Sequence, residues 1–463
     1  MSELFDGVLA TGPVRPEVGD SAWLKAMLDF ESALAEASAD AGLFERAHAD
    51  RIARTCREAY FDLAELGARA AATGNPAAPL VRELTAKVGG EAAAFVHFGA
   101  TSQDVLDTAA MLVAVRALKA LRPDLRACAD LAASFAETHS RTVQAGRTLL
   151  QQALPVTFGL VAAGWLAGLD AAGARLDAQR PAVQLGGATG TLASLGAHGP
   201  AVVAALAARL ELAEPALPWH TERSRVTDLA SALGQACGTV SGIARAIVLL
   251  AQTEVAEVRE VGPGGSGGSS TMPHKRNPVA AVAADACARQ APGLVAALLG
   301  SAAHEHQRAA GAWHAEWRPF AELLRSTGSA VHWLRTSLER LEVDPGRMRA
   351  NLDTGGGVML AERVTTELVA TSAGRDAGIP AVGRLEAHDA VARCCERALA
   401  GAGDLVDLLA ADPLVGSRLS ARRISDLLDP AGYLGSAAVF AERAVALHRA
   451  ARGRTHRERG EGS

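Results

Sequence analysis

The chain has 463 residues, of which 49% are hydrophobic and 21% charged, a balance typical of a soluble globular protein with two or three domains. Its formal net charge of −5 provides no basic field, which argues against a nucleic-acid partner. Only 4% of the residues are aromatic, whereas alanine and leucine dominate, and this composition favours helices over sheets.

The cysteines and the N-terminal sequence both indicate a cytoplasmic protein. The six cysteines show no CxxC or Cys/His ligand spacing, so we expect reduced thiols and no metal site. The N-terminus carries acidic residues and no charged-then-apolar signal. No apolar run reaches the roughly 20 residues of a membrane span. We therefore expect a cytoplasmic protein without a membrane partner.

Helical periodicity runs through most of the chain. One apolar face repeats every three or four residues, with Asp104 just before it as a helix cap; its members are Leu106, Ala110, Val113, Ala117 and Leu121. Pro123 is expected to kink or interrupt this helix. No segment shows convincing strand alternation. Further helices are expected near 153–180, 200–212, 226–260 and 320–341.

The helix from Val226 to Leu250 carries few charges on any face, and such a helix must be buried on several sides. A bundle whose outer faces are also covered predicts association between subunits. We expect an N-terminal helical domain (1–110), a central helix bundle (111–355) and a small C-terminal helical domain (356–463). The charged tail from Arg452 is expected to be disordered.

Two glycine-rich breaks interrupt the helices, at 186–190 and 262–268. The second contains matches to G-x-G-x-x-G and G-x-S-x-G. Both patterns need a preceding strand, whereas 248–260 resembles a helix rich in Ala, Leu and Glu. We therefore reject both matches.

The most informative segment follows that break and reads GGSSTMPHKRNP from Gly267 to Pro278. Exposed backbone N–H groups of glycines suit the binding of an anion. A hydroxyl such as that of Ser269, beside amide donors and the ammonium group of Lys275, could be stabilised in its deprotonated form and act as a base. A disordered surface linker is the less favoured alternative, because linkers rarely end in such a sequence.

This segment resembles the GSSxMPxKxNP signature of the fumarase/aspartase superfamily, whose members add or eliminate a group beta to a carboxylate. The resemblance implies that Ser269 is the catalytic base and that Lys275 acts with it. It also implies that Asn277 and Met272 contact the substrate. The implied architecture is all-α, a three-domain fumarase/aspartase-type fold. Its central bundle of long helices forms the core of a homotetramer, and three subunits contribute to each site.

A second segment, from His97 to Asp104, resembles the superfamily pattern H-x-G-x-T-S-x-D. The resemblance implies that Thr101 and Ser102, near a helix N-terminus, bind a substrate carboxylate. His97 is either a binding or polarising group or purely structural.

A third segment, GRTLLQ from Gly146 to Gln151, resembles the superfamily pattern G-R-T-H-x-Q and implies that Arg147 and Gln151 are second-rank contacts. Arg15, from the N-terminal segment, is a further candidate contact.

Two departures indicate the branch of the superfamily. Leu149 replaces the histidine of many members, and Val282 replaces the glutamate that pairs with it. Neither side chain can relay a proton, so no general acid acts there. A leaving hydroxide or amine needs protonation, whereas a carboxylate is stable as an anion. The resemblance is therefore to the cycloisomerase branch, in which the substrate's own carboxylate adds across a conjugated double bond and forms a lactone.

Other segments agree with that branch, including GATSQDV at 99–105 and AAGAWHAEW at 309–317, while Gly74-Asn75-Pro76 replaces a histidine-containing segment of adenylosuccinate lyases. The substrate is left open by Leu149, where the branch often has Trp, and by Ser224, where it has Asp.

We expect a small di- or tricarboxylate substrate and neither a metal nor an organic cofactor. A loop at 262–272 should be mobile when empty and close over the substrate. The alternatives are a lyase that expels another stable anion such as nitrite, and less favourably an adenylosuccinate lyase. A catalytically dead structural relative is disfavoured because Ser269 and Lys275 are both present.

Overall fold

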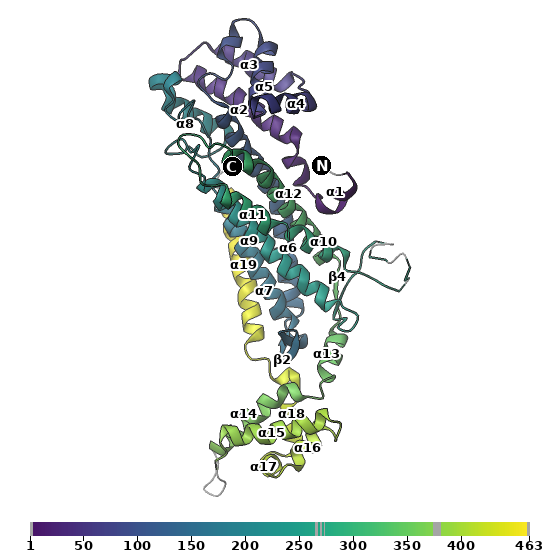
Figure 1. The fold of residues 1–463 in the computed structure, drawn as a ribbon. Coiled ribbons are helices and arrows are strands. Elements are labelled where there is room, and N and C mark those ends of the chain that lie inside the picture. The colour runs from purple at the N-terminus through teal and green to yellow at the C-terminus, as the bar shows by residue number, and fades with distance from the viewer. Residues whose placement is uncertain (1–2, 264–266, 269–270, 273, 374–380, 461–463) are drawn as a thin grey trace. The chain divides into compact units, whose positions relative to one another are not determined.

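The computed structural model describes residues 3–263, 267–268, 271–272, 274–373 and 381–460, and Figure 1 labels its helices and strands. In these residues the fold is helical apart from four short strands, which confirms the predicted all-α class. The chain forms two compact units, one of residues 1–127, 171–245 and 280–336, the other of residues 128–170, 246–279 and 337–463. The three-domain division with boundaries near 110 and 355 stays a prediction.

Four long helices contain four of the five positions at which the chain passes between the units, namely α6 (Ser102–Thr138), α7 (Phe158–Asp177), α9 (Ser224–Leu250) and α12 (Ala312–Glu339). The remaining elements of the first unit are α1 (Glu3–Leu9), η1 (Arg15–Val18), α2 (Asp20–Asp40), α3 (Arg46–Glu58), α4 (Leu63–Thr73), α5 (Ala77–Val88), η2 (Glu91–Phe95), η3 (Ala193–His198), α8 (Gly199–Leu210), α10 (Val279–Ala288, from Ala280 on) and α11 (Ala291–Gly300).

Local sequence explains where the N-terminal helices begin and end. The Asp62 carboxylate accepts from the backbone N–H groups of Ala64 and Glu65 and so caps α4. Gly74 ends the same helix at φ 74°, a conformation that favours glycine. Helix α2 packs against α3 and α8. Phe30 and Ile52 are among the fully buried side chains of this core.

Helix α6 corrects two expectations. It begins at Ser102, so Asp104 lies inside its first turn and is not the cap. Pro123 lies within the helix, which continues to Thr138, so the proline does not end it. The apolar residues flanking Pro123, among them Leu121 and Leu125, are buried, and their packing offsets the hydrogen bond that a proline removes.

Helix α9 is the one described helix long and apolar enough to cross a membrane by length and composition, and 44% of its most apolar window is buried in the structure. The sequence had not singled it out as a possible span. The core helix of a soluble protein has the same properties. Leu233, Val240 and Ile247 are among its fully buried side chains, as expected for a helix that is apolar on several sides.

The second unit contains a β-hairpin that the sequence did not predict. Strands β1 (Val143–Thr148) and β2 (Gln151–Thr157) pair antiparallel, and helix α7 therefore starts at Phe158 rather than near 153. Leu149 and Leu150 form the turn at φ 51° and 66°. Two consecutive positive φ values match the twist of a two-residue hairpin turn.

A second short pair, β3 (Val258–Glu260) and β4 (Leu341–Val343), is antiparallel. The helix expected over 248–260 is not formed. Helix α9 ends at Leu250, and strand β3 stands immediately before the glycine-rich stretch. Both rejected motifs require a strand that leads through the glycine turn directly into a helix. Here the next helix, α10, begins only at Val279, so the rejection stands on that ground.

The rest of the second unit is helical: α13 (Pro345–Asp353), η4 (Val358–Leu360), α14 (Ala361–Ala373), α15 (Arg384–Leu399), α16 (Leu405–Ala411), α17 (Pro413–Gly416), α18 (Ala421–Leu427), η5 (Pro430–Gly432) and α19 (Ala437–Gly460). Val364, Leu368, Val391, Leu409 and Ile424 belong to the core of α14–α18.

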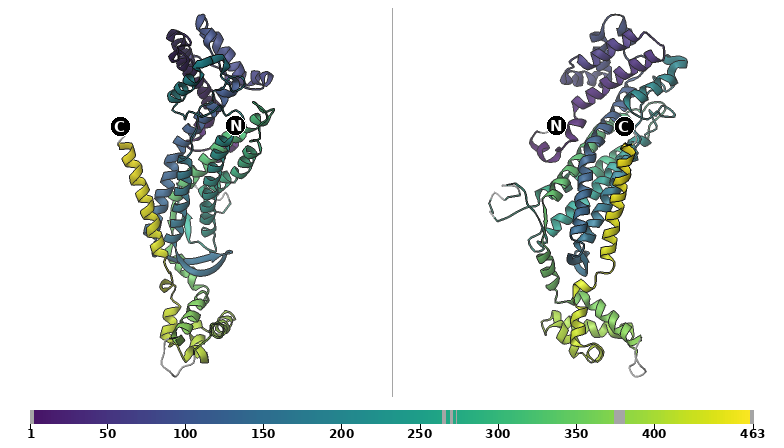
Figure 2. Two further views of the ribbon diagram at one scale, coloured as in Figure 1. Left: turned by 90° about the vertical axis from the view of Figure 1, so that its left-hand side faces the viewer. Right: turned by 180° about the vertical axis from the view of Figure 1, so that it is seen from behind.

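Helix α19, yellow in Figure 2, runs to Gly460, so the tail expected to be disordered from Arg452 is helical over its described residues. His448 holds helix α19 in place through two aspartates, with Nδ1 2.9 Å from Asp170 and Nε2 3.0 Å from Asp130. Arg452 adds an ion pair of 2.6 Å to Asp130.

All six cysteines are free thiols, as expected. Burial raises the pKa of Cys237 to about 11, although Thr327 hydrogen-bonds to it, and raises the pKa of Cys287 to about 12. Such thiols remain protonated and unreactive near neutral pH.

Candidate functional site

The start of α6 carries the candidate carboxylate-binding hydroxyls. Thr101 immediately precedes the helix and Ser102 is its first residue, and both are half-buried. The first N–H groups of a helix lack intrahelical partners and favour negative charge. The carboxylate of Asp104 accepts one of these donors, the N–H of Thr101, at 3.0 Å. The other donors and the two hydroxyls form an end that can receive a carboxylate.

Asp104 connects the glycine-rich segment 186–190 to the start of α6 through hydrogen bonds. Its side chain is fully buried and accepts from the backbone N–H groups of Gly186 and Gly187 at 3.0 and 2.9 Å. Gly187 has φ +68°, and a Cβ there would lie 2.9 Å from the carbonyl oxygen of Gly99, so only glycine fits. His220 Nε2 lies 2.6 Å from the same carboxylate.

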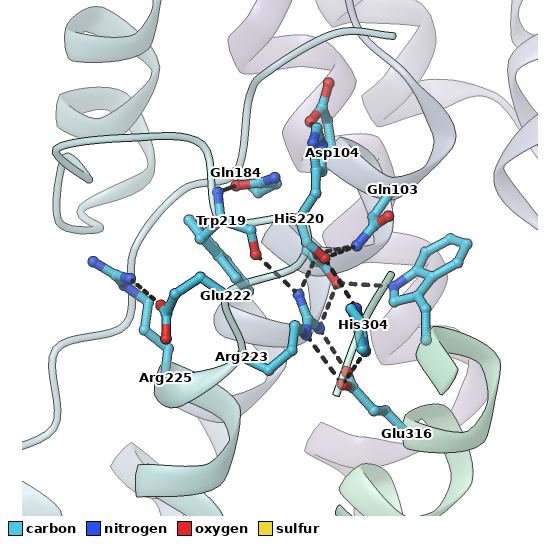
Figure 3. A network of polar contacts seen from close by, with 12 residues as sticks. Gln103, Asp104, Gln184, Trp219, His220, Glu222, Arg223, Arg225, His304 and Glu316 are labelled. Atoms are coloured by element: carbon cyan, nitrogen blue, oxygen red, sulfur yellow. Dashed lines mark hydrogen bonds and ion pairs between the residues drawn. The ribbon is translucent and has the colours of Figure 1, made fainter. Parts of the chain in front are cut away.

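A buried ion-pair network continues from that point, and Figure 3 shows it. Arg223, with 2% of its side chain exposed, donates to Asp107 of α6 at 2.8 and 3.1 Å and to Glu316 of α12 at 3.0 and 2.6 Å. Burial alone would lower the pKa of Arg223, but the two carboxylates raise it further above its usual value. Trp313 Nε1 also donates to Asp107 at 3.0 Å.

These contacts show what the sequence reading missed. The sequence indicates only Ser224 as a departure from the branch pattern and assigns no role to Arg223 or His220. Gln103 Nε2 bridges Asp107, at 3.1 Å, and the carbonyl oxygen of His220, at 2.8 Å. The charged residues inside the segments 97–104, 219–225 and 309–317 were the available signal.

Two other candidates of the first unit make no hydrogen bond to this network. His97 Nδ1 lies 2.7 Å from Glu31 Oε1 of α2. Arg15 begins η1 and is exposed, and its guanidinium has no hydrogen bond or ion pair among the described residues. The structure therefore gives Arg15 no fixed position in a site.

In the second unit, Arg147 is held by a buried carboxylate. It lies in β1 and donates to both oxygens of Glu257 at 2.6 and 3.0 Å, and the Glu257 side chain is fully buried. Asn351 Nδ2 donates to the same carboxylate at 2.8 Å. Gln151 begins β2 and is exposed. Arg147 is thus built into the hairpin, and its contact with substrate, like that of Gln151, stays a prediction.

The described part of the glycine loop is closed at its base. Asn277 donates from its backbone N–H and from Nδ2 to the carbonyl oxygen of Gly267, at 2.8 and 3.0 Å. Gly267 has φ +72°, and a Cβ there would lie 2.4 Å from the Asn277 carbonyl oxygen. Gly268 and Arg276 form a bridge beside this clamp. The amide of Asn277 therefore shapes the loop, and its contact with substrate stays a prediction.

Lys275 and Met272 are both exposed, and the N–H of Lys275 donates to the carbonyl oxygen of Met272 at 3.0 Å. The Lys275 ammonium has no partner among the described residues. Ser269, the predicted base, lies outside the described residues, so its role stays a prediction.

Leu149 and Val282 occupy the two positions at which many superfamily members have a paired histidine and glutamate, and neither side chain can transfer a proton. Leu149 is 97% exposed at the tip of the β1–β2 hairpin, and Val282 is half-exposed on α10. Among the described residues, no group of three or more His, Cys, Asp or Glu could hold a metal ion.

Comparison with known proteins places the chain. A profile of the family described as Lyase matches residues 10–293, and a profile described as Adenylosuccinate lyase C-terminus matches residues 357–444. The chain therefore belongs to the lyase family of the fumarase/aspartase superfamily, whose members are enzymes.

Within that family, the chain is similar along nearly its whole length to cycloisomerases. It is 43% identical over 455 residues to a 3-carboxy-cis,cis-muconate cycloisomerase of Pseudomonas aeruginosa, with 97% of each chain covered. The solved 3-carboxy-cis,cis-muconate lactonizing enzyme of Pseudomonas putida is 40% identical, with a TM-score of 0.90 and coverage of 97% of this chain and 99% of that one. A nitrosuccinate lyase of Streptomyces davaonensis is 41% identical over 457 residues, covering 96% and 94%.

Proposed function

We propose that the protein is a 3-carboxy-cis,cis-muconate cycloisomerase, which converts that substrate to 4-carboxymuconolactone in aromatic catabolism. The observation that carries the proposal is the 43% identity over 97% of both chains to an enzyme of that name. Leu149 and Val282 support it, because a reaction in which a carboxylate attacks or leaves needs no general acid at that place.

In the proposed reaction, a carboxylate oxygen of the substrate forms a bond to one carbon of a conjugated double bond. The displaced electron pair moves toward the carbon next to a second carboxylate and gives an enolate-like dianion. The hydroxyl of Ser269 delivers a proton to that carbon, and in the reverse direction its alkoxide removes it. Lys275, Asn277, Thr101 and Ser102 stabilise the developing charge, the usual role of preorganised donors.

We further propose a homotetramer with sites shared between subunits. Large apolar side chains that are exposed in the single chain support it, among them Leu149, Leu249, Val282 and Leu299. Buried between subunits, they would contribute the hydrophobic free energy that holds oligomers together. Six free thiols support a reducing, cytoplasmic location.

The experiment is to mix purified protein with 3-carboxy-cis,cis-muconate and to follow the loss of its conjugated ultraviolet absorbance without added metal. We expect rapid loss by the wild type and by Ser301→Ala, a control serine whose hydroxyl donates to a helix carbonyl. We expect almost none with Ser269→Ala. No absorbance change with wild-type protein would contradict the cycloisomerase assignment.

A second candidate function is elimination of nitrite from nitrosuccinate, which the 41% identity to a nitrosuccinate lyase supports. Nitrite, like a carboxylate, leaves as a stable anion and needs no general acid. Measuring nitrite release from nitrosuccinate under the same conditions separates the two functions, because only the lyase produces nitrite.

A further inference from the structure

Glu31 is a buried carboxylate to which no role has so far been assigned. It lies in the middle of α2 and is 1% exposed. Oε2 has no hydrogen-bond partner among the described residues, and Oε1 lies 2.7 Å from His97 Nδ1. A buried carboxylate without a compensating charge is strongly destabilising. The partner that compensates Glu31 is therefore His97.

The contact with Glu31 fixes the orientation of the His97 ring. A carboxylate only accepts hydrogen bonds, so Nδ1 must carry the proton and donate to Glu31. The opposite edge of the ring carries Nε2, which has no hydrogen-bond partner among the described residues. The side chain is 17% exposed, so this edge retains access to a ligand.

The backbone holds His97 next to the candidate carboxylate-binding end of α6. His97 has φ 60°, an uncommon conformation for a residue with a side chain. Its carbonyl oxygen accepts from the N–H of Ala100 at 3.3 Å, which closes a turn immediately before Thr101. Gly99, at φ +75°, lets this turn pack against Leu195, since a Cβ there would lie 2.5 Å from that side chain. The turn is therefore rigidly placed.

The charged surroundings of His97 favour the imidazolium. Burial alone would lower the pKa of His97, but attraction by Glu31, the hydrogen bond to Glu31 and attraction by Asp104 together raise it above its ordinary value. Glu31 faces the ring from α2 and Asp104 acts from α6, and the Asp104 carboxylate is itself bound by His220. The nearby aromatic residues Phe95 and Phe98 carry no charge.

We infer that Glu31 holds His97 as an imidazolium whose Nε2–H donates to a substrate carboxylate, beside the one bound by Thr101 and Ser102. Glu31 is then a positioning residue, and His97 is a binding residue for a second carboxylate of a tricarboxylate substrate. This inference rests on the proposed function for the identity of the substrate. A fixed cation in this place stabilises the dianion more than it stabilises the substrate, because the negative charge grows as the new bond forms.

The test compares Glu31→Gln with wild type in two measurements. A glutamine oxygen can still accept from Nδ1, so the ring keeps its orientation and loses the charged partner. The first measurement is the dissociation constant of propane-1,2,3-tricarboxylate, a nonreactive tricarboxylate, by calorimetry between pH 6 and pH 9. We expect Glu31→Gln to bind about tenfold more weakly at pH 8, from the loss of a hydrogen bond to a charged group.

The second measurement is the pH dependence of kcat/KM with 3-carboxy-cis,cis-muconate. Glu31 raises the pKa of His97, so the wild type should keep its activity to a higher pH than Glu31→Gln, in which the alkaline decline moves to lower pH. KM should rise more than kcat falls. His97→Asn should lose this alkaline decline altogether.

The matched control is His48→Gln, a half-buried histidine whose ring lies 4.9 Å from that of Phe95 and which has no role in the proposed site. It should bind the tricarboxylate like wild type. If Glu31→Gln kept both the wild-type affinity and its pH dependence, the inference would be overturned. If wild type bound the tricarboxylate in the Glu31-dependent manner but left the muconate unchanged, the proposed function would fail and the inference would stand.

Discussion

The start of α6 and the base of the glycine loop differ in how they hold their polar groups. At the start of α6, the charged side chains of Asp104, Asp107 and Arg223 are buried and paired with one another or with neighbouring residues. At the loop base, the Gly267–Asn277 clamp closes the chain, while the Lys275 side chain is exposed and has no partner among the described residues.

This difference indicates a division of labour. Buried, fully paired groups cannot reorient without leaving a charge unpaired, so the start of α6 is suited to recognise carboxylates in one fixed geometry. An exposed ammonium has no such restraint and can adjust to the bound substrate. Substitutions at the first region should therefore alter stability as well as activity, whereas substitutions at the loop should alter activity alone.

The largest expected effect is that of Arg223→Met. It removes the shared charged partner of Asp107 and Glu316, so that Asp107 keeps only neutral donors and Glu316 keeps only His304, at 3.2 Å. We expect a loss of about 3–5 kcal/mol in the free energy of unfolding, the usual result of breaking a buried pair. Urea unfolding measures it. The triple variant with Asp107→Leu and Glu316→Leu should recover much of the loss, and a failure of Arg223→Met to destabilise would contradict the network's structural role.

Lys275→Met should give a comparable effect on catalysis and none on stability. We expect kcat to fall about a hundredfold to a thousandfold, as when one donor to a developing anion is removed. The melting temperature should match wild type, because the exposed side chain supports no described contact. Steady-state kinetics and calorimetry measure the two quantities. Arg276→Met, at an exposed neighbouring residue, is the control. A large drop in the melting temperature of Lys275→Met would contradict the claim that the loop side chains affect activity alone.

Asp104→Asn should give a smaller and mixed effect. The amide group would face N–H donors of Thr101, Gly186 or Gly187 in place of an acceptor. We expect a loss of about 1–3 kcal/mol in stability, the range for an unsatisfied buried polar group. KM should rise because Thr101 and Ser102 lose their support. Unchanged stability together with unchanged KM would show that Asp104 does not fix this end of the helix.

The fold class could be predicted from the sequence, whereas carboxylate binding at the start of α6 stays a prediction. Helical periodicity is local, and the H-x-G-x-T-S-x-D and GSSxMPxKxNP patterns are long enough to be specific. The β1–β2 hairpin could not, because Leu149 and Leu150 adopt positive φ without the glycine or asparagine that normally signals such a turn. Of the two expected effects of Pro123, a kink or an interruption, the interruption does not occur, because tertiary packing outweighs the local effect of the proline.

The buried network was also out of reach from the sequence. Asp104 and His220 are 116 positions apart, as are Arg223 and Asp107, and no local pattern pairs residues at that distance. The local sequence predicts a helix cap at Asp104, because an acidic residue just before an apolar helix face commonly has that role. Its actual role depends on the glycine-rich break that folds back onto it.

The most direct test of the central claim is turnover of 3-carboxy-cis,cis-muconate in D2O, followed by proton NMR and mass spectrometry of the product. If Ser269 delivers the proton to the carbon next to a carboxylate, wild-type enzyme should give 4-carboxymuconolactone with one deuterium at that carbon, and Ser269→Ala should form it at least a hundredfold more slowly, within the usual contribution of a general acid or base. Formation of the same labelled lactone by Ser269→Ala at the wild-type rate would contradict the account.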